Sequence, residues 1–182
     1  MFGKKKPQQQ EADDDSPWVV QVLTRDYLIE GFCEAEDDLG SNFLEVEVGE
    51  DMNGSLLTLS QPNIQPAGAA AVALPPNSKY VLPANTEFVA IIPNNNTSLA
   101  YAMKHAGSGN TPIGAVVLAA HYVIRGVVLC PGTGLEMLSD YALFAMQDAT
   151  VDYVGPGARL TNLDAPFILV RTSQVQGFFV NP

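Results

Sequence analysis

Four carboxylates between positions 34 and 38 are the residues of this chain best suited to chemistry. Glu34, Glu36, Asp37 and Asp38 follow an apolar segment that ends at Cys33. Hard cations such as Ca²⁺ bind carboxylate oxygens, so one hypothesis is a metal or small-ligand site on an acidic rim. The segment lacks the alternating D-x-D-x-D-G spacing of a calcium loop. That difference favours the alternative, a solvated acidic hairpin tip.

The cysteines and histidines form no metal-site pattern. Cys33 and Cys130 lie far apart in the sequence. His105 and His121 have no further Cys or His nearby at the spacing of a zinc site. We expect both cysteines to be buried free thiols, and a disulfide between them is the alternative. The sequence therefore predicts no cofactor and no zinc.

Sequence motifs of known catalytic chemistry are also missing. No G-x-S-x-G nucleophile motif occurs in the chain. The glycines within 107–109 and 132–134 are not followed by the Lys-Ser/Thr of a phosphate-binding loop. We therefore expect that the protein is not an enzyme.

The charge is strongly acidic and unevenly distributed. The 182 residues include 9 Lys and Arg against 20 Asp and Glu, a net charge of −11. Residues 18–103 contain eleven acids and two bases, whereas residues 104–182 contain five acids and four bases. Binding of nucleic acid requires a basic surface that releases phosphate counterions, so no nucleic-acid partner is expected.

The sequence also lacks signals for membrane insertion or secretion. No apolar run approaches the roughly 20 residues of a membrane-spanning helix. Lys4, Lys5 and Lys6 are followed by Pro and Gln rather than by the apolar stretch of a signal peptide. We expect a cytoplasmic protein without a membrane partner.

One pattern occurs twice in the chain. The segment VLTRDYLIEG at 22–31 returns 95 positions later as VLAAHYVIRG at 117–126. A second similar pair, residues 88–92 and 167–171, follows in the same order. Two matches in the same order predict a duplicated domain. Gly31 and Gly126 take the same place in the first pair, and glycine within a strand indicates a bulge, a bend or a close backbone approach.

Short segments of β-branched and aromatic residues, separated by turns, predict an all-β protein. We expect two tandem small β-barrels, Sm-like or SH3-like, or β-sandwich repeats after a disordered N-terminal tail. The tail is predicted at 1–17, β domain 1 at 18–103, a linker at 104–112 and β domain 2 at 113–182. Domain 1 is expected to carry an insertion at about 51–71, with a loop at 61–71.

The first strand of each predicted domain is long. Residues 18–32 are expected to form one long strand or two strands joined at a bend, and residues 113–129 a long bent strand. Residues 135–140 are expected to form a helical turn or a loop.

The second half carries five short motifs in a fixed order: HYVIRG at 121–126, PG at 131–132, LSDY at 138–141, DATV at 148–151 and APFILV at 165–170. With them, this half resembles an uncharacterised family of small bacterial β domains. The first half keeps YLIEG at 27–31 and SNFL at 41–44. The resemblance implies a fold and brings no activity and no catalytic residues. A weaker likeness to Sm-like barrels rests on strand order.

Glu30 and Arg125 occupy equivalent positions in the repeated pattern and carry opposite charges. Five apolar residues are predicted on the same faces, namely Leu28, Phe32, Val123, Val127 and Leu129. A face that mixes apolar and charged residues suits an interface. We therefore predict that the halves pack through these faces, with Glu30 near Arg125. The alternative is that both charges point to solvent.

The features that bear on function favour an interaction protein over an enzyme. A duplicated β domain, a charged-residue content of only 16% and no catalytic set are consistent with self-assembly or protein–protein interaction. The expected partner is another protein or a second copy, in a possible homo-oligomer. Small-ligand or metal binding on the acidic rim is the first alternative. RNA binding by analogy with Sm-like barrels is the second, and the charge opposes it.

Overall fold

The computed structural model describes residues 18–33, 55–67, 77–83, 88–94, 110–131, 134–158 and 160–180. These residues confirm the all-β prediction, because they form β-strands and two short 3₁₀ helices but no α-helix. The predicted tail at 1–17 lies outside the described residues.

The first half of the protein contains β1 (Trp18–Thr24), β2 (Tyr27–Cys33), β3 (Ser55–Pro66), β4 (Lys79–Pro83) and β5 (Phe88–Pro93). The second half contains β6 (Asn110–Ala119), β7 (Tyr122–Pro131), β8 (Leu143–Tyr153), β9 (Leu163–Arg171) and β10 (Val175–Val180). The 3₁₀ helices are η1 (Leu135–Asp140), at the predicted helical turn, and η2 (Thr172–Gln174).

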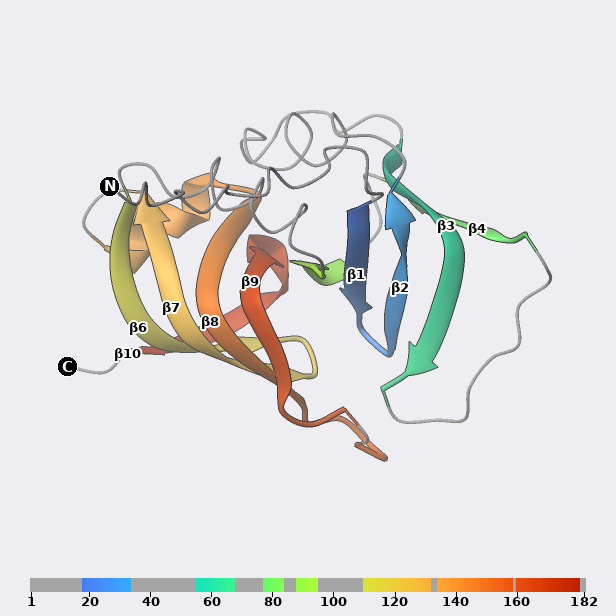
Figure 1. Ribbon diagram of the computed structural model, residues 1–182. Helices are drawn as coiled ribbons and strands as arrows, with labels where there is room; N and C mark the ends of the chain where they lie inside the picture. The colour runs from blue at the N-terminus through green and yellow to red at the C-terminus, as the bar shows by residue number, and fades with distance from the viewer. Residues whose placement is uncertain are drawn as a thin grey trace, which may run out of the picture.

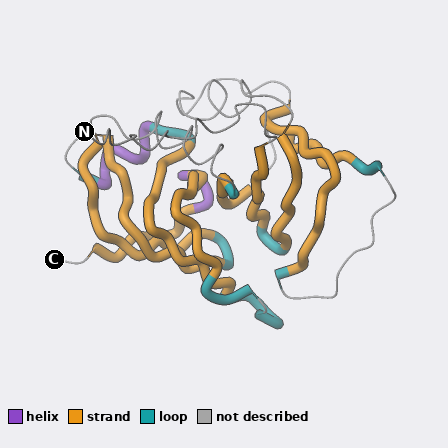
Figure 2. The backbone as a smooth tube through the Cα atoms, in the orientation of Figure 1, coloured by secondary structure: helices purple, strands orange, loops and turns teal. Residues whose placement is uncertain are grey.

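The described strands form one open antiparallel sheet (Figures 1 and 2). Its order is β10-β6-β7-β8-β9-β5-β1-β2-β3-β4. Each half therefore places its fifth strand first, followed by its first, second, third and fourth strands. The sheet is not closed, and the structure does not confirm two separate barrels or sandwiches. Strands β10 and β4 form the two edges of the sheet.

The segments predicted as long first strands are β-hairpins. Strands β1 and β2 are joined by a turn at Arg25 and Asp26, and β6 and β7 by a turn at Ala120 and His121. The bent strand predicted over 113–129 was therefore wrong. Neither turn contains glycine or proline, the strongest turn signals in a sequence.

The two repeated glycines face matching β-bulges. The pairing of β2 with β3 shifts at Gly31, and the pairing of β7 with β8 shifts at Gly126. Each bulge holds a residue with positive φ, Gln61 at 50° and Asp148 at 49°. A Cβ added to Gly126 would lie 2.7 Å from the carbonyl oxygen of Gln147. Of the alternatives predicted for these glycines, the structure shows a bulge at both positions and a close backbone approach at Gly126.

Part of the insertion predicted at about 51–71 forms a strand, β3. Residues 61–66 belong to β3 and pair with β2, so the loop predicted at 61–71 was wrong over these positions. Pro62 and Pro66 resemble strand breakers in sequence, but proline is tolerated at a bulge or at a strand end. Extra length lies between β2 and β3, which end at Cys33 and begin at Ser55. The matching strands in the second half end at Pro131 and begin at Leu143.

The linker predicted at 104–112 ends earlier than predicted, because its last three residues belong to a strand. Strand β6 begins at Asn110, and residues 110–112 pair with β7. These residues therefore belong to the sheet.

The similarity between residues 88–92 and 167–171 does not reflect equivalent positions. These segments form β5 and β9, which lie side by side and pair Ala90 with Val170 and Ile91 with Leu169. In the strand order the counterpart of β5 is β10, and the counterpart of β9 is β4. All six residues of β5 are buried. A strand buried on both faces is apolar throughout, and this shared environment explains the similarity.

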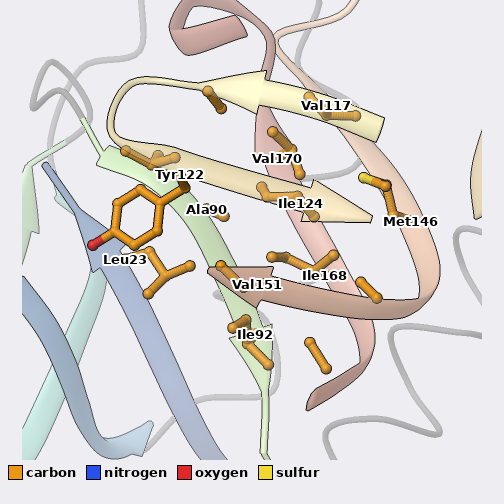
Figure 3. Close-up of a cluster of buried hydrophobic side chains, with 14 of the residues drawn as sticks. Leu23, Ala90, Ile92, Val117, Tyr122, Ile124, Met146, Val151, Ile168 and Val170 are labelled. Atoms are coloured by element: carbon orange, nitrogen blue, oxygen red, sulfur yellow. The ribbon is translucent and has the colours of Figure 1, made fainter. Parts of the chain in front are cut away.

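Two hydrophobic clusters pack against the sheet, and each contains residues from both halves. The large cluster is built mainly from the second half, with six residues from the first: Leu23, Leu28, Ala67, Val89, Ala90 and Ile92. Figure 3 labels Leu23, Ala90 and Ile92 beside residues of the second half. The small cluster is built mainly from the first half, with four residues from the second: Leu129, Ala145, Phe167 and Leu169. In β9, Phe167 and Leu169 belong to the small cluster, whereas Ile168 belongs to the large one. The central strands therefore connect the two cores.

Candidate functional site at the junction and the sheet edges

The predicted acidic site cannot be placed, because Glu34, Glu36, Asp37 and Asp38 lie outside the described residues. Among the residues that are described, no group of three or more His, Cys, Asp and Glu could hold a metal ion. The described part of the chain also contains no helix long and apolar enough to span a bilayer.

The predicted ion pair between Glu30 and Arg125 was wrong. The Glu30 carboxylate accepts hydrogen bonds from Nε2 of Gln21 at 2.7 Å and from Nδ2 of Asn94 at 2.8 Å. Arg125 donates instead to the carboxylate of Asp152. Strands β2 and β7 are separated by four strands in the sheet order, so each charge finds a partner within its own half.

The apolar residues of the predicted interface are divided between the core and the surface. Leu28 is 4% exposed and Leu129 is 7% exposed, and they belong to the large and the small cluster respectively. Phe32, Val123 and Val127 are half-buried. Packing of the halves through these faces stays a prediction.

The prediction for the cysteines can be tested at one of the two positions. Cys130 is a buried free thiol, as expected. Burial raises its pKa, and Glu136 raises it further, so the unreactive thiol form is favoured. The side chain of Cys33 lies outside the described part.

The two hairpin turns meet where the halves come together. The Tyr122 hydroxyl donates a 2.9 Å hydrogen bond to the backbone carbonyl of Thr24. Burial raises the pKa of Tyr122 well above its ordinary value, with smaller contributions from Tyr153 and Asp26, so the hydroxyl keeps its proton. Next to it, Nδ1 of His121 lies 3.8 Å from the Asp26 carboxylate. A tyrosine hydroxyl on the second hairpin is thus bonded directly to the first.

A cavity of about 380 Å³ lies between these turns. Its lining is Arg25, Asp26, Tyr27, Pro66, His121, Tyr153 and Pro156. These described lining residues include no Ser, Thr or Cys nucleophile, and the His121 Nδ1 makes no hydrogen bond. Among the described residues, the cavity therefore contains no pair of nucleophile and base.

At the centre of the sheet, β5 and β9 form the backbone junction between the halves. Ile91 and Leu169 pair across it and both belong to the small cluster. The guanidinium of Arg171 also lies 4.9 Å from the ring centre of Phe88, within the range of a cation–π contact. The junction thus combines strand pairing, apolar burial and a cation–π contact.

The pairing registers show which residues of β5 and β10 are equivalent. Val22 pairs with Ile91 in the first half. Val117, which is 95 positions after Val22, pairs with Phe178 in the second half. Ile91 therefore corresponds to Phe178, and the next residue, Ile92, corresponds to Phe179.

The same comparison relates β4 to β9. Leu59 pairs with Cys33 on one side and Tyr80 on the other. Met146 pairs with Val128, the counterpart of Cys33, and with Ile168. Tyr80 therefore corresponds to Ile168, and the next residue, Val81, corresponds to Leu169.

Residues that are buried at the junction have exposed counterparts at the sheet edges. Ile92 is 1% exposed and its counterpart Phe179 is 62% exposed. Leu169 is 1% exposed and its counterpart Val81 is 49% exposed. Val180, beside Phe179, is 49% exposed as well. The two edge strands thus present the same kind of surface that the junction buries.

Sequence reasoning did not identify these edge residues. The sequence predicts short strands at 80–82 and 176–180, and nothing in it indicates that either strand lies at an edge. Only the strand order shows that β4 and β10 are outermost. The repeat could have given a signal if residues 88–92 of β5 had been aligned with β10 instead of with β9. That alignment makes Phe179 the counterpart of Ile92.

Comparison of the chain with protein-family models, with curated proteins and with solved structures gives no match. The resemblance of the second half to small bacterial β domains therefore stays a prediction, and function must be argued from the site.

Proposed function

We propose that this protein is a non-enzymatic cytoplasmic protein that acts by self-assembly or protein–protein interaction, and that it binds through the sheet edges β4 and β10. The observation that carries the proposal is the exposure of Val81, Phe179 and Val180 on these two strands. An edge strand offers unpaired backbone N–H and C=O groups, and a partner strand can pair with them.

Natural sheets usually protect their edges with charges, prolines or bulges. Here, three of the five large hydrophobic side chains that are exposed in the described residues lie on the two edge strands. An apolar edge is an aggregation hazard unless a specific partner covers it, and this supports a binding role for both edges.

We also infer that the two halves are copies of one small β unit. The shared strand order, the matched bulges at Gly31 and Gly126 and the equivalent registers support this inference. In the order of the described strands, such a unit places a fourth strand at one edge and a fifth strand at the other.

The proposal can be tested with a double edge variant. Tagged full-length protein and the Val81→Asp, Phe179→Asp variant are each analysed by light scattering, both purified and in extract of the source cells. We expect the natural chain in a complex larger than 19.4 kDa and the variant as a monomer. A natural chain that stays monomeric in buffer and in extract contradicts the proposal.

A matched control excludes a general effect of a new surface charge. Val154 is 61% exposed and lies outside the described strands. Val154→Asp should leave the complex intact.

A further inference from the structure

We infer that the occupant of each sheet edge is a second copy of this chain, with β4 of one molecule paired antiparallel to β10 of the next. This inference rests on the proposed function and specifies the partner. The resulting assembly is head-to-tail.

The molecule already contains one example of this junction. Strand β9 is the fourth strand of its half and pairs with β5, the fifth strand of the other half. Strand β4 is likewise a fourth strand and β10 a fifth strand. A contact between β4 and β10 therefore repeats, between molecules, a pairing that this sequence makes internally.

The register of the internal junction predicts the register between molecules. Ile91 lies opposite Leu169, so their counterparts Phe178 and Val81 should lie opposite each other. Phe178 packs against Phe144, with ring centres 5.8 Å apart, at the border of the large cluster. Val81 from the next molecule would extend this apolar surface, as Leu169 extends the small cluster.

The exposed fractions agree with this arrangement. Leu169 is 1% exposed because the other half covers it, whereas Val81 is 49% exposed at the free edge. Pairing with a second copy would cover Val81 and Phe179 together. Burial of apolar area contributes about 25 cal/mol per Å², and it favours the contact along the whole edge.

Charge favours the head-to-tail contact over a symmetric contact between two β4 strands. Residues 18–103 carry eleven acids and two bases, so pairing β4 with β4 would bring two strongly acidic halves together. Residues 104–182 carry five acids and four bases, so pairing β4 with β10 joins an acidic half to a nearly neutral one. Like charges placed across an interface weaken it.

Strands β10 and β4 are the first and the last in the order of the described strands, β10 beside β6 and β4 beside β3. Figure 1 labels β4 next to β3 and β10 next to β6. Each copy that joins through one edge presents the other edge to the next copy. A contact of this type forms a ring if the rotation closes and a filament if it does not. A symmetric dimer would use only one edge of each molecule.

Two single variants with complementary blocked edges test the inference. Val81→Asp places a charge on β4 and leaves β10 unchanged, and Phe179→Asp does the reverse. Both positions are exposed in the isolated chain, so each variant should fold, which melting temperature and circular dichroism verify. Molar mass is measured by light scattering for each variant alone and for an equimolar mixture.

We expect each variant alone to be a 19.4 kDa monomer and the mixture to form a dimer of twice that mass. In the mixture, the unchanged β10 of one chain meets the unchanged β4 of the other. Dimers of Val81→Asp alone would show pairing between β10 strands, and dimers of Phe179→Asp alone would show pairing between β4 strands. Either result overturns the inference, as does a mixture that stays monomeric.

The experiments distinguish a failure of this inference from a failure of the proposed function. If the mixture stays monomeric while the natural chain still forms an edge-dependent complex in extract, the partner is another protein and the edges remain binding sites. If the natural chain forms no complex in either setting, both proposals are wrong.

Discussion

Leu169 and Val81 occupy equivalent positions in the two halves, yet Leu169 is 1% exposed and Val81 is 49% exposed. Leu169 packs in the small cluster, which contains residues from both halves. Leu169→Ala should lower the free energy of unfolding by about 2–5 kcal/mol, the range for a large-to-small core substitution. Chemical denaturation of the monomer at low concentration measures this change.

Val81→Ala is the matched control for that substitution. An exposed side chain changes monomer stability by less than about 0.5 kcal/mol. Val81→Ala should therefore leave the monomer unchanged and weaken only the assembly. Equal losses of monomer stability at the two positions would contradict the assignment of one to a junction and the other to a free edge.

The hydrogen bond from Tyr122 to Thr24 connects the two hairpin turns and predicts a second asymmetry. Tyr122→Phe removes the hydroxyl and leaves the Thr24 carbonyl without this donor. We expect a loss of about 1 kcal/mol in the free energy of unfolding. Tyr27 is the counterpart of Tyr122 in the first half and is 41% exposed, so Tyr27→Phe should have no measurable effect. A Tyr122→Phe variant as stable as the natural chain would show that the bond does not stabilise the protein.

The close approach at Gly126 predicts that a methyl group cannot be accommodated there. A Cβ would lie 2.7 Å from the Gln147 carbonyl oxygen and 3.0 Å from the Ala149 Cα, and both are backbone atoms. Gly126→Ala should lower the free energy of unfolding by about 1–3 kcal/mol, as forced overpacking does. Gly114 has open space around its Cβ position, so Gly114→Ala serves as the control and should be tolerated. Thermal unfolding of the two variants compares them directly.

Asp152 predicts a defined dependence of stability on pH. A hydrogen bond from the Asn162 backbone N–H lowers its pKa first, and the bond from Arg125 lowers it further. Because the pKa in the folded state lies below the ordinary value of 3.8, this group stabilises the fold above that pH. The stabilisation is lost as the pH falls through the lowered pKa.

Asp152→Asn is the corresponding experiment. The site is close to the surface, so the loss at neutral pH should be less than about 1 kcal/mol. The difference between the variant and the natural chain should vanish at a pH below the lowered pKa. A difference that persists unchanged at that pH would mean that the charge of Asp152 contributes nothing.

The sequence predicted the strand class, several strand positions and the bulges, because these depend on local patterns. Gly31 and Gly126 mark the same bulge in both halves, and the repeat made this visible. Two strands joined at a bend was one of the two alternatives for residues 18–32, and this alternative is confirmed. The turn between β6 and β7 was missed because its residues, such as Ala120, give no turn signal. Ala120 has a φ of 49°, a conformation that no local sequence pattern indicated.

The candidate site could not be predicted for a different reason. Whether Phe179 is exposed or buried depends on which strand lies at the edge of the sheet, and this is a property of the whole topology. The partners of Glu30 and Arg125 likewise depend on which strands are neighbours in the sheet. Their opposite charges suggested a pair, but Gln21 and Asp152 are closer within their own halves.

The most direct test of the proposed contact is a disulfide placed at its predicted register. A chain with Val81→Cys is mixed with a chain with Phe178→Cys under mild oxidation, and a mixture of Lys79→Cys with Phe178→Cys is the control two residues out of register. Cys33 and Cys130 are present in every chain and cancel in the comparison. We predict a disulfide-linked dimer from Val81 with Phe178 and little from Lys79 with Phe178. No dimer from the first mixture, or equal yields from both, would contradict the pairing of β4 with β10.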